Sequence, residues 1–240
     1  MQLIVLSAGR GSRLPHKFRN KPKCLVELNS KPLILYNKDF FSLFKKKIIV
    51  AGYKHKSLDK ISREIGFTKI LNKNFSSTNM VYSLFLTKKN VSQDVVIVYG
   101  DILFDKSVYN IVKLKKNVLP VNVNWLKNWK KRMSFKKILN DAESLKVKKG
   151  KILEIGTSLD KYNLPKYQFM GIIKLKKNSY LKCFHYFKKL KNYKIDMTSF
   201  LNLCIKNKII ALNALKYKKY WFEIDNKLDF KFTEREIKRW

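Results

Sequence analysis

Short apolar runs alternate with amphipathic segments along the first half of the chain. The amphipathic segments predict helices that begin near residues 30–32 and that cover about 57–65 and 80–86. The apolar runs predict buried strands at residues 3–6, 25–28, 48–51, 69–71 and 95–99. This alternation predicts an α/β fold in which helices cover both faces of a parallel sheet.

The second half of the chain is less regular. Helical spacing is found at about 180–190, 197–206 and 228–238, and strand-like runs lie at 118–123, 152–155, 168–175, 209–212 and 221–224. With 8 Gly and 5 Pro the chain has little linker character, and 240 residues can build one large core. We therefore predict one domain over residues 1–240, with a three-layer Rossmann-like fold and a mixed, mainly parallel sheet.

Positive charge is the most conspicuous feature of the composition. Lys and Arg total 53 against 17 Asp and Glu, which gives a formal net charge of +36. Such an excess can mark a surface for nucleic acid or anionic membranes. Phosphate recognition favours Arg, however, and only seven of these 53 cationic residues are Arg. The lysines are also spread over the whole chain. A general bias toward lysine explains the charge best, so we expect no nucleic-acid partner, although the charge would attract anionic substrates.

The cysteines and the apolar segments indicate the cellular compartment of the protein. Cys24, Cys183 and Cys204 are odd in number and widely spaced, which fits neither a disulfide framework nor a zinc site. The first residues lack the basic region and the apolar length of a secretory signal. No run approaches the roughly 20 apolar residues of a membrane helix. We expect a cytoplasmic protein without a transmembrane segment, and the sequence leaves a homodimer open.

Three loops that follow predicted strands carry the candidate chemistry, at residues 9–13, 52–53 and 100–101. Ligands of parallel sheets bind outside the carboxyl ends of the strands, so these loops should share one crevice. Glycines in the first loop let backbone N–H groups approach a polyphosphate, and Arg13 could clamp its outer phosphates. This loop is not a Walker A motif, because no GK[ST] follows. Lys23, stiffened by Pro22, would enter the same crevice.

Two carboxylates lie where strand-like runs end. Asp101 and Asp225 could hold Mg²⁺, which takes one or two carboxylates and fills its other positions with substrate phosphates and water. Each also has a structural alternative: Asp101 could cap a strand end, and Asp225 could begin the last helix. Glu223 lies on the same face as Asp225 and could be the ligand instead. We expect Asp101 and Asp225 to converge on one Mg²⁺ site.

Two motifs in register, SAGRGSRL at 7–14 and KPKCLVELNSKPLI at 21–34, resemble the N-terminal signature of the sugar-phosphate and phosphocholine-type nucleotidylyltransferases. Three later segments resemble the phosphocholine cytidylyltransferase branch: NMVYSL at 79–84, YGDILF at 99–104 and WFEID at 221–225. The resemblance covers nearly the whole chain. It departs from the family near Asn122, where an acidic residue is typical.

The resemblance implies a nucleotidyltransferase fold and the transfer of CMP from CTP to a small phosphorylated acceptor, with release of pyrophosphate, for the decoration of surface glycans such as a capsule polysaccharide. Residues 1–115, approximately, would bind the NTP, and the remainder to 240 would bind the acceptor and complete the Mg²⁺ site. Lys23 and Arg13 would be catalytic, and an acceptor phosphate that is already ionised needs no general base. The expected nucleotide contacts are Ala8, Gly9, Arg10, Gly11, Ser12, Arg13, Gly52, Asn79 and Gly100.

Aromatic residues and carboxylates of the second half suit an acceptor with an amine or a quaternary ammonium group, through cation–π attraction and charge pairing. The acceptors that the resemblance implies are phosphocholine, 2-aminoethylphosphonate or a phosphorylated amino-acid derivative. The predicted acceptor site consists of Trp125, Arg132, Asp141, Glu143 and Tyr167, with Trp129 and Phe169 nearby. In a structural alternative these aromatics are core residues. Residues 195–201 also resemble sugar-phosphate members, so a sugar-1-phosphate nucleotidylyltransferase is the alternative function, and a basic nucleic-acid-binding protein is a more distant one.

Overall fold

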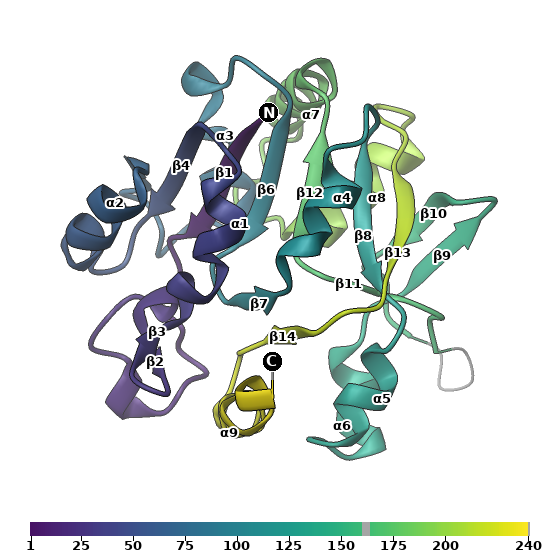
Figure 1. Cartoon of the computed structure of the whole chain (residues 1–240). Coiled ribbons are helices and arrows are strands. Elements are labelled where there is room, and N and C mark those ends of the chain that lie inside the picture. Colours follow the sequence, from purple (N-terminus) through teal and green to yellow (C-terminus); the bar gives the residue numbers. More distant parts are fainter. Residues whose placement is uncertain (160–163, 240) are drawn as a thin grey trace.

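The computed structural model describes residues 1–159 and 164–239. Its central sheet crosses both halves of the chain (Figure 1). The strands of this sheet are β1 (Gln2–Ser7), β4 (Lys46–Ala51), β5 (Thr68–Leu71), β6 (Val95–Tyr99), β8 (Val118–Asn122), β9 (Leu145–Lys148), β10 (Lys151–Ile155), β11 (Gln168–Phe169), β12 (Ile172–Leu175) and β13 (Asn213–Tyr217). Across the described residues their order is β5-β4-β1-β6-β12-β8-β13-β10-β9, and β11 pairs with β8.

Strand β1 organises the first half of the sheet. All six of its residues are buried, and it pairs in parallel with β4 on one side and with β6 on the other. In this register Leu6 lies opposite Val50 and Tyr99, so the three strands end at one edge of the sheet. The chain therefore leaves all three strands close together, and the backbone N–H of Gly100 donates to the carbonyl of Leu6 at 2.9 Å.

The second half of the sheet is mixed. Strand β12 runs antiparallel to β6 and to β8, whereas β13 runs parallel to β8. Strands β9 and β10 form an antiparallel pair at the far edge. The predicted α/β class, with a mixed and mainly parallel sheet, is confirmed.

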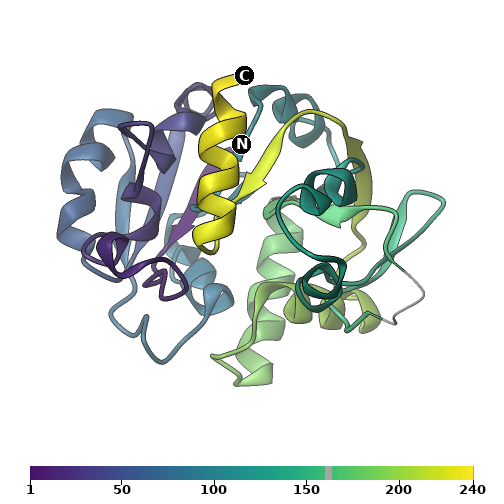
Figure 2. The ribbon, with the colours of Figure 1, turned by 90° about the horizontal axis from the view of Figure 1, so that it is seen from below.

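Helices cover both faces of the sheet. In Figures 1 and 2, α1 and α4 lie on one face, and α3, α7 and α8 lie on the other, which gives three layers. The α-helices are α1 (Lys38–Ser42), α2 (Asp59–Ile65), α3 (Met80–Phe85), α4 (Tyr109–Val112), α5 (Trp125–Lys130), α6 (Phe135–Asp141), α7 (Lys177–Leu190), α8 (Met197–Lys206) and α9 (Lys227–Glu236). Short 3-10 helices occur at His16–Phe18, Lys23–Leu25, Leu33–Asn37, His55–Leu58, Lys88–Asn90, Lys106–Val108 and Ile237–Arg239. No helix of the described chain is long and apolar enough to cross a membrane.

A small two-stranded sheet returns the end of the chain to the first half. Strand β14 (Trp221–Glu223) pairs antiparallel with β7 (Ile102–Phe104), and the backbone N–H of Ile224 donates to the carbonyl of Asp101 at 3.2 Å. A separate hairpin joins β2 (Glu27–Leu28) to β3 (Lys31–Pro32). The pairing of β14 with β7 places Asp225 beside Asp101, although the two lie far apart in the sequence.

Several elements differ from the sequence prediction. The apolar run 209–212 is a connection rather than a strand, with Ile210 and Leu212 buried and Ala211 exposed, and pairing begins only at Asn213, where β13 meets β8. The strand expected at 168–175 is divided into β11 and β12, because Gly171 adopts φ +73° between them. The helix expected after Pro32 begins with a 3-10 segment before α1. The expected strand at 25–28 is a 3-10 turn followed by β2. The sequence did not predict α4, α5, α6, β7 or β9.

Candidate active site

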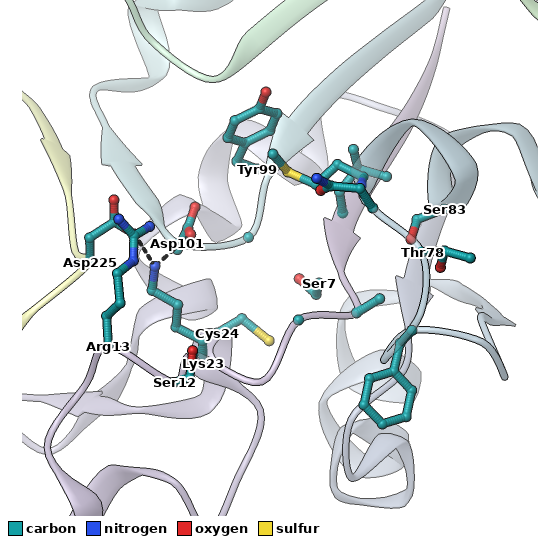
Figure 3. A pocket seen from close by; sticks show the side chains of 18 residues that line it. Ser7, Ser12, Arg13, Lys23, Cys24, Thr78, Ser83, Tyr99, Asp101 and Asp225 are labelled. Atoms are coloured by element: carbon teal, nitrogen blue, oxygen red, sulfur yellow. Dashed lines mark hydrogen bonds and ion pairs between the residues drawn. The ribbon is translucent and has the colours of Figure 1, made fainter. Parts of the chain in front are cut away.

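A cavity of about 410 Å³ opens where β1 and β6 end. Figure 3 shows its labelled side chains, among them Ser12 and Arg13 of the glycine-rich loop, Lys23, and Asp101 and Asp225. The predicted residues that line it are Ala8, Gly9, Gly11, Ser12, Arg13, Lys23, Asn79, Gly100, Asp101 and Asp225. The prediction that loops from separate strands share one crevice therefore holds for the loops after β1 and β6.

Two of the predicted nucleotide contacts, Gly52 and Arg10, do not line this cavity. Gly52 is not among the lining residues. It lies beneath the glycine-rich loop, where an added Cβ would come within 2.6 Å of the Ala8 carbonyl oxygen, so it supports the loop rather than facing the cavity. Arg10 is exposed, and its guanidinium lies 5.8 Å from the ring centre of Tyr53 and 5.6 Å from that of Phe75.

Gly11 sets the distance between the glycine-rich loop and Lys23. Its φ of +64° is a left-handed conformation that glycine adopts without steric cost. A Cβ at this position would lie 3.1 Å from the Cβ of Lys23. The loop can therefore lie directly against Lys23, as expected for two motifs that serve one site.

Lys23 lies between two carboxylates that come from distant parts of the chain. Its Nζ donates hydrogen bonds to Asp101 Oδ2 at 2.7 Å and to Asp225 Oδ1 at 2.6 Å. Burial alone would lower the pKa of the Lys23 ammonium, but the charges and hydrogen bonds of Asp101 and Asp225 outweigh burial and raise it. Lys23 is therefore a cation held in a defined position.

Asp225 has a second cationic partner. Arg13 Nη2 lies 3.0 Å from Asp225 Oδ1. Burial opposes ionisation of Asp225, but Lys23 and Arg13 together hold its pKa below the ordinary value, so this carboxylate is ionised. The structure thus brings together four of the residues that the sequence singled out: Arg13, Lys23, Asp101 and Asp225.

The two carboxylates fit a hard divalent cation. Asp101 Oδ1 is buried and has no hydrogen-bond partner in the described chain, which leaves one carboxylate oxygen for a further ligand. The described residues contain no group of three His, Cys, Asp or Glu side chains arranged to hold a metal ion. A Mg²⁺ ion at Asp101 and Asp225 would thus need substrate phosphates and water as its other ligands, which is its usual mode of binding.

A second cavity, of about 250 Å³, adjoins the first. Both are lined by Arg13, Met80, Tyr99 and Asp225. Six carboxylates face the second cavity: Asp141, Glu143, Asp196, Glu223, Asp225 and Asp229. Its described lining contains two basic side chains, Arg13 and Arg132, and no lysine. The cavity is therefore acidic, in a chain whose net charge is +36.

The residues predicted for acceptor binding divide into two groups. Arg132, Asp141 and Glu143 line the second cavity, as do the neighbouring Trp129 and Phe169, whereas Trp125 and Tyr167 do not. Trp125 is 1% exposed, and its indole N–H donates to the Pro165 carbonyl at 3.2 Å, so it is a core residue. Tyr167 packs against the core as well. For Trp125 and Tyr167 the alternative interpretation, that they are core residues, is therefore the one that the structure supports.

Arg132 and Glu223 both line the second cavity. Arg132 forms a buried ion pair with Asp229 and lies 5.0 Å from the ring centre of Trp129. Glu223 lines the second cavity rather than the first. Burial, together with the charges of Asp225 and Asp101, raises the pKa of the Glu223 carboxyl.

Comparison with known proteins decides the family. No family model matches the chain. It is 30% identical to the CTP:phosphoglutamine cytidylyltransferase of Campylobacter jejuni, over 94% of the chain and 96% of that protein. The chain belongs to the nucleotidylyltransferase superfamily, in its cytidylyltransferase branch.

Other members agree in sequence and in fold. The choline-phosphate cytidylyltransferase of Streptococcus pneumoniae is 35% identical to the chain, over 46% of the chain and 49% of that protein. The inositol-1-phosphate CTP transferase of T. maritima superposes with a TM-score of 0.77 at 20% identity and covers 99% of this chain and 96% of its own. The Rossmann-like nucleotidyltransferase fold expected from the sequence is thereby confirmed.

Sequence reasoning missed several residues of this cytidylyltransferase site. Asp196 and Thr198 begin α8 and reach the second cavity, as do Gln168, Tyr99 and Met80. Asp196 gave a signal, because it precedes a helix as a typical N-cap, and its side chain accepts a hydrogen bond from the Ser199 N–H at 2.8 Å. That signal indicated a helix start and not a cavity.

Proposed function

We propose that the protein transfers CMP from CTP to the phosphate of a small acceptor that carries a cationic nitrogen, with Mg²⁺ as cofactor and pyrophosphate as leaving group. The observation that carries this proposal is the acidic second cavity. Six of the chain's 17 acidic residues line it, next to Arg13 of the glycine-rich loop. Carboxylates in a partly enclosed cavity attract a cationic end group, repel an anionic one and gain no charge pairing with a neutral one. Phosphocholine, an aminoalkylphosphonate and a phosphorylated amino-acid derivative fit this description.

The reaction follows from the contact between the two cavities. An oxygen of the acceptor phosphate attacks the α-phosphorus of CTP, a new P–O bond forms, and the bond from the α-phosphorus to the bridging oxygen of pyrophosphate breaks. The attacking oxygen is already ionised, so the step needs positioning and charge neutralisation rather than a general base. Arg13, Met80, Tyr99 and Asp225 line both cavities, so the attacking oxygen and the α-phosphorus would meet there.

The residues of the first cavity would neutralise the triphosphate. Backbone N–H groups and side chains of residues 9–13 would hold the outer phosphates, and the Lys23 ammonium would stabilise charge at the α-phosphate. Asp101 and Asp225 would hold Mg²⁺, which supplies further positive charge to the phosphates when it is bound.

A matrix of substrates tests the proposal. Pyrophosphate release is measured for the four common NTPs against phosphorylated amines, phosphorylated amino-acid derivatives and sugar 1-phosphates. We expect CTP with an amine-bearing acceptor to give a kcat/KM at least about 10-fold above any sugar 1-phosphate, because charge pairing in a desolvated site is worth that much. Preferred use of a sugar 1-phosphate would replace this proposal by the alternative function.

Metal dependence is a separate expected result. Chelation should abolish turnover, and Mg²⁺ should restore it. Asp101→Asn should lower kcat by at least about 100-fold and raise the Mg²⁺ concentration needed for half-maximal rate, because a metal ion contributes several kcal/mol of charge stabilisation. Asp39→Asn is the control, since Asp39 is 78% exposed. Equal Mg²⁺ requirements for the two variants would contradict the assignment of Asp101.

We also infer that the enzyme works in the cytosol. The three cysteines are buried free thiols, which suits a reducing compartment. Cell fractionation should recover the protein with cytosolic enzymes, and recovery with a secreted fraction would contradict this inference.

A further inference from the structure

Part of the second cavity, the proposed acceptor site, has no role in the phosphate chemistry described above. Thr198 lies there between two carboxylates, with its hydroxyl oxygen 2.9 Å from Glu143 Oε1 and 2.9 Å from Asp196 Oδ1. A threonine hydroxyl has a single proton and can donate to only one of them at a time. The group therefore has more hydrogen-bond acceptors than donors, and a ligand with N–H donors would complete it.

Gln168 gives independent support for the same conclusion. It lies on β11, lines this cavity and is 6% exposed. Its side-chain oxygen Oε1 is buried and has no hydrogen-bond partner in the described chain. Buried amide oxygens almost always have a donor, and the rare exceptions point to a missing water, ion or ligand.

The aromatic residues of the cavity do not form an open cage. Trp129 has the Arg132 guanidinium 5.0 Å from its ring centre and the edge-on ring of Trp125 at 5.3 Å. The rings of Tyr99 and Phe169 pack edge to face at 5.9 Å. A quaternary ammonium group is recognised by several aromatic faces that surround it, whereas an N–H-bearing ammonium is recognised by directed hydrogen bonds. The cavity offers the second kind of environment.

Building on the proposed function, we infer that the cationic nitrogen of the acceptor carries hydrogen, as a primary ammonium does, and that Glu143, Asp196 and Gln168 select it over a quaternary ammonium. The backbone holds this group in place. Asp196 is fixed as the N-cap of α8, and Gly156 approaches Thr198 so closely that an added Cβ would lie 2.5 Å from the Thr198 Cβ. Specificity would therefore depend on a rigid set of hydrogen-bond acceptors.

A methylation series tests the inference directly. Phosphoethanolamine, its N-methyl and N,N-dimethyl derivatives and phosphocholine share the phosphate and the positive charge but lose one N–H donor at each step. With CTP and Mg²⁺ present, kcat/KM should fall along the series by at least about 100-fold in total, because a site built for N–H donors strongly rejects an analogue that lacks them. The KM for CTP should stay nearly constant.

Variants identify the residues responsible. Gln168→Ala and Glu143→Gln should each raise the KM for phosphoethanolamine by about 10-fold or more while changing the KM for phosphocholine much less, which flattens the series. Gln93→Ala is the matched control, because Gln93 is exposed and bonds the N-terminal ammonium. An unchanged KM for CTP shows in each case that the fold is intact.

The outcomes separate the inference from the function on which it rests. If phosphocholine is used as well as phosphoethanolamine, or better, the inference is wrong and the proposed function stands. A series that keeps its slope in both Gln168→Ala and Glu143→Gln also overturns it. If no member of the series is used and a sugar 1-phosphate is, the proposed function itself fails.

Discussion

Lys23→Ala should lower kcat by about 100-fold or more, as the removal of one electrostatic stabiliser does in other enzymes. Lys23 provides a fixed cation at the point where the glycine-rich loop, Asp101 and Asp225 meet. Its hydrogen bonds hold the ammonium in position before the substrates arrive, so little reorganisation is needed when charge develops at the α-phosphorus. Steady-state kinetics with saturating CTP and acceptor measure the effect.

Lys21→Ala is the matched control for this experiment. Lys21 lies two residues earlier and pairs with Glu27 at 2.6 Å on the surface, where both side chains are substantially exposed. Its replacement should leave kcat within about two-fold, because exposed ion pairs contribute little. Near-normal turnover of Lys23→Ala would show that Lys23 has a structural role only.

Asp229→Asn should lower the free energy of unfolding by about 3–5 kcal/mol, because it removes one partner of a buried ion pair. The side chains of Arg132 and Asp229 are 7% and 3% exposed, so the buried Arg132 charge would lose the carboxylate with which it pairs directly. Asp229 also accepts hydrogen bonds from the backbone N–H groups of Asp225 at 3.0 Å and Asn226 at 3.2 Å. The substitution thus weakens the start of α9 as well, directly after Asp225.

Thermal and denaturant unfolding measure this loss, which corresponds to a fall in Tm of roughly 10 °C for a chain of this size. Glu64→Gln is the control, since the ion pair between Lys38 and Glu64 is 54% and 46% exposed and should contribute less than about 1 kcal/mol. Equal stabilities of the two variants would show that the Arg132–Asp229 pair contributes no more than a surface pair.

The sequence predicted most residues that line the first cavity, for a physical reason. The buried runs that became β1, β4 and β6 are almost wholly apolar, and parallel strands must end at one edge of the sheet. Asp101 follows the most strand-like of these runs. Asp225 also follows a strand-like run, and this shared context together with the resemblance to the family related it to Asp101. No local pattern predicts that β14 pairs with β7, which is the contact that brings the two together.

The lining of the second cavity was less predictable. An aromatic residue such as Trp125 suits a cation site and a hydrophobic core equally well, and only packing distinguishes them. Asp196 and Thr198 had a clear local function at the start of α8, which concealed their position in the cavity. The run 209–212 has the composition of a strand, but pairing depends on the register between β13 and β8, which apolar composition does not determine.

The fate of two labelled phosphorus atoms tests the central claim most directly. The protein is incubated with Mg²⁺, phosphoethanolamine and CTP that carries ³²P at either the α or the γ position. Transfer of CMP predicts that the α label appears in a CDP-linked amine and that the γ label appears in pyrophosphate. Movement of the γ label to the acceptor, or an α label that reaches only sugar-linked products across the acceptor panel, would contradict the account.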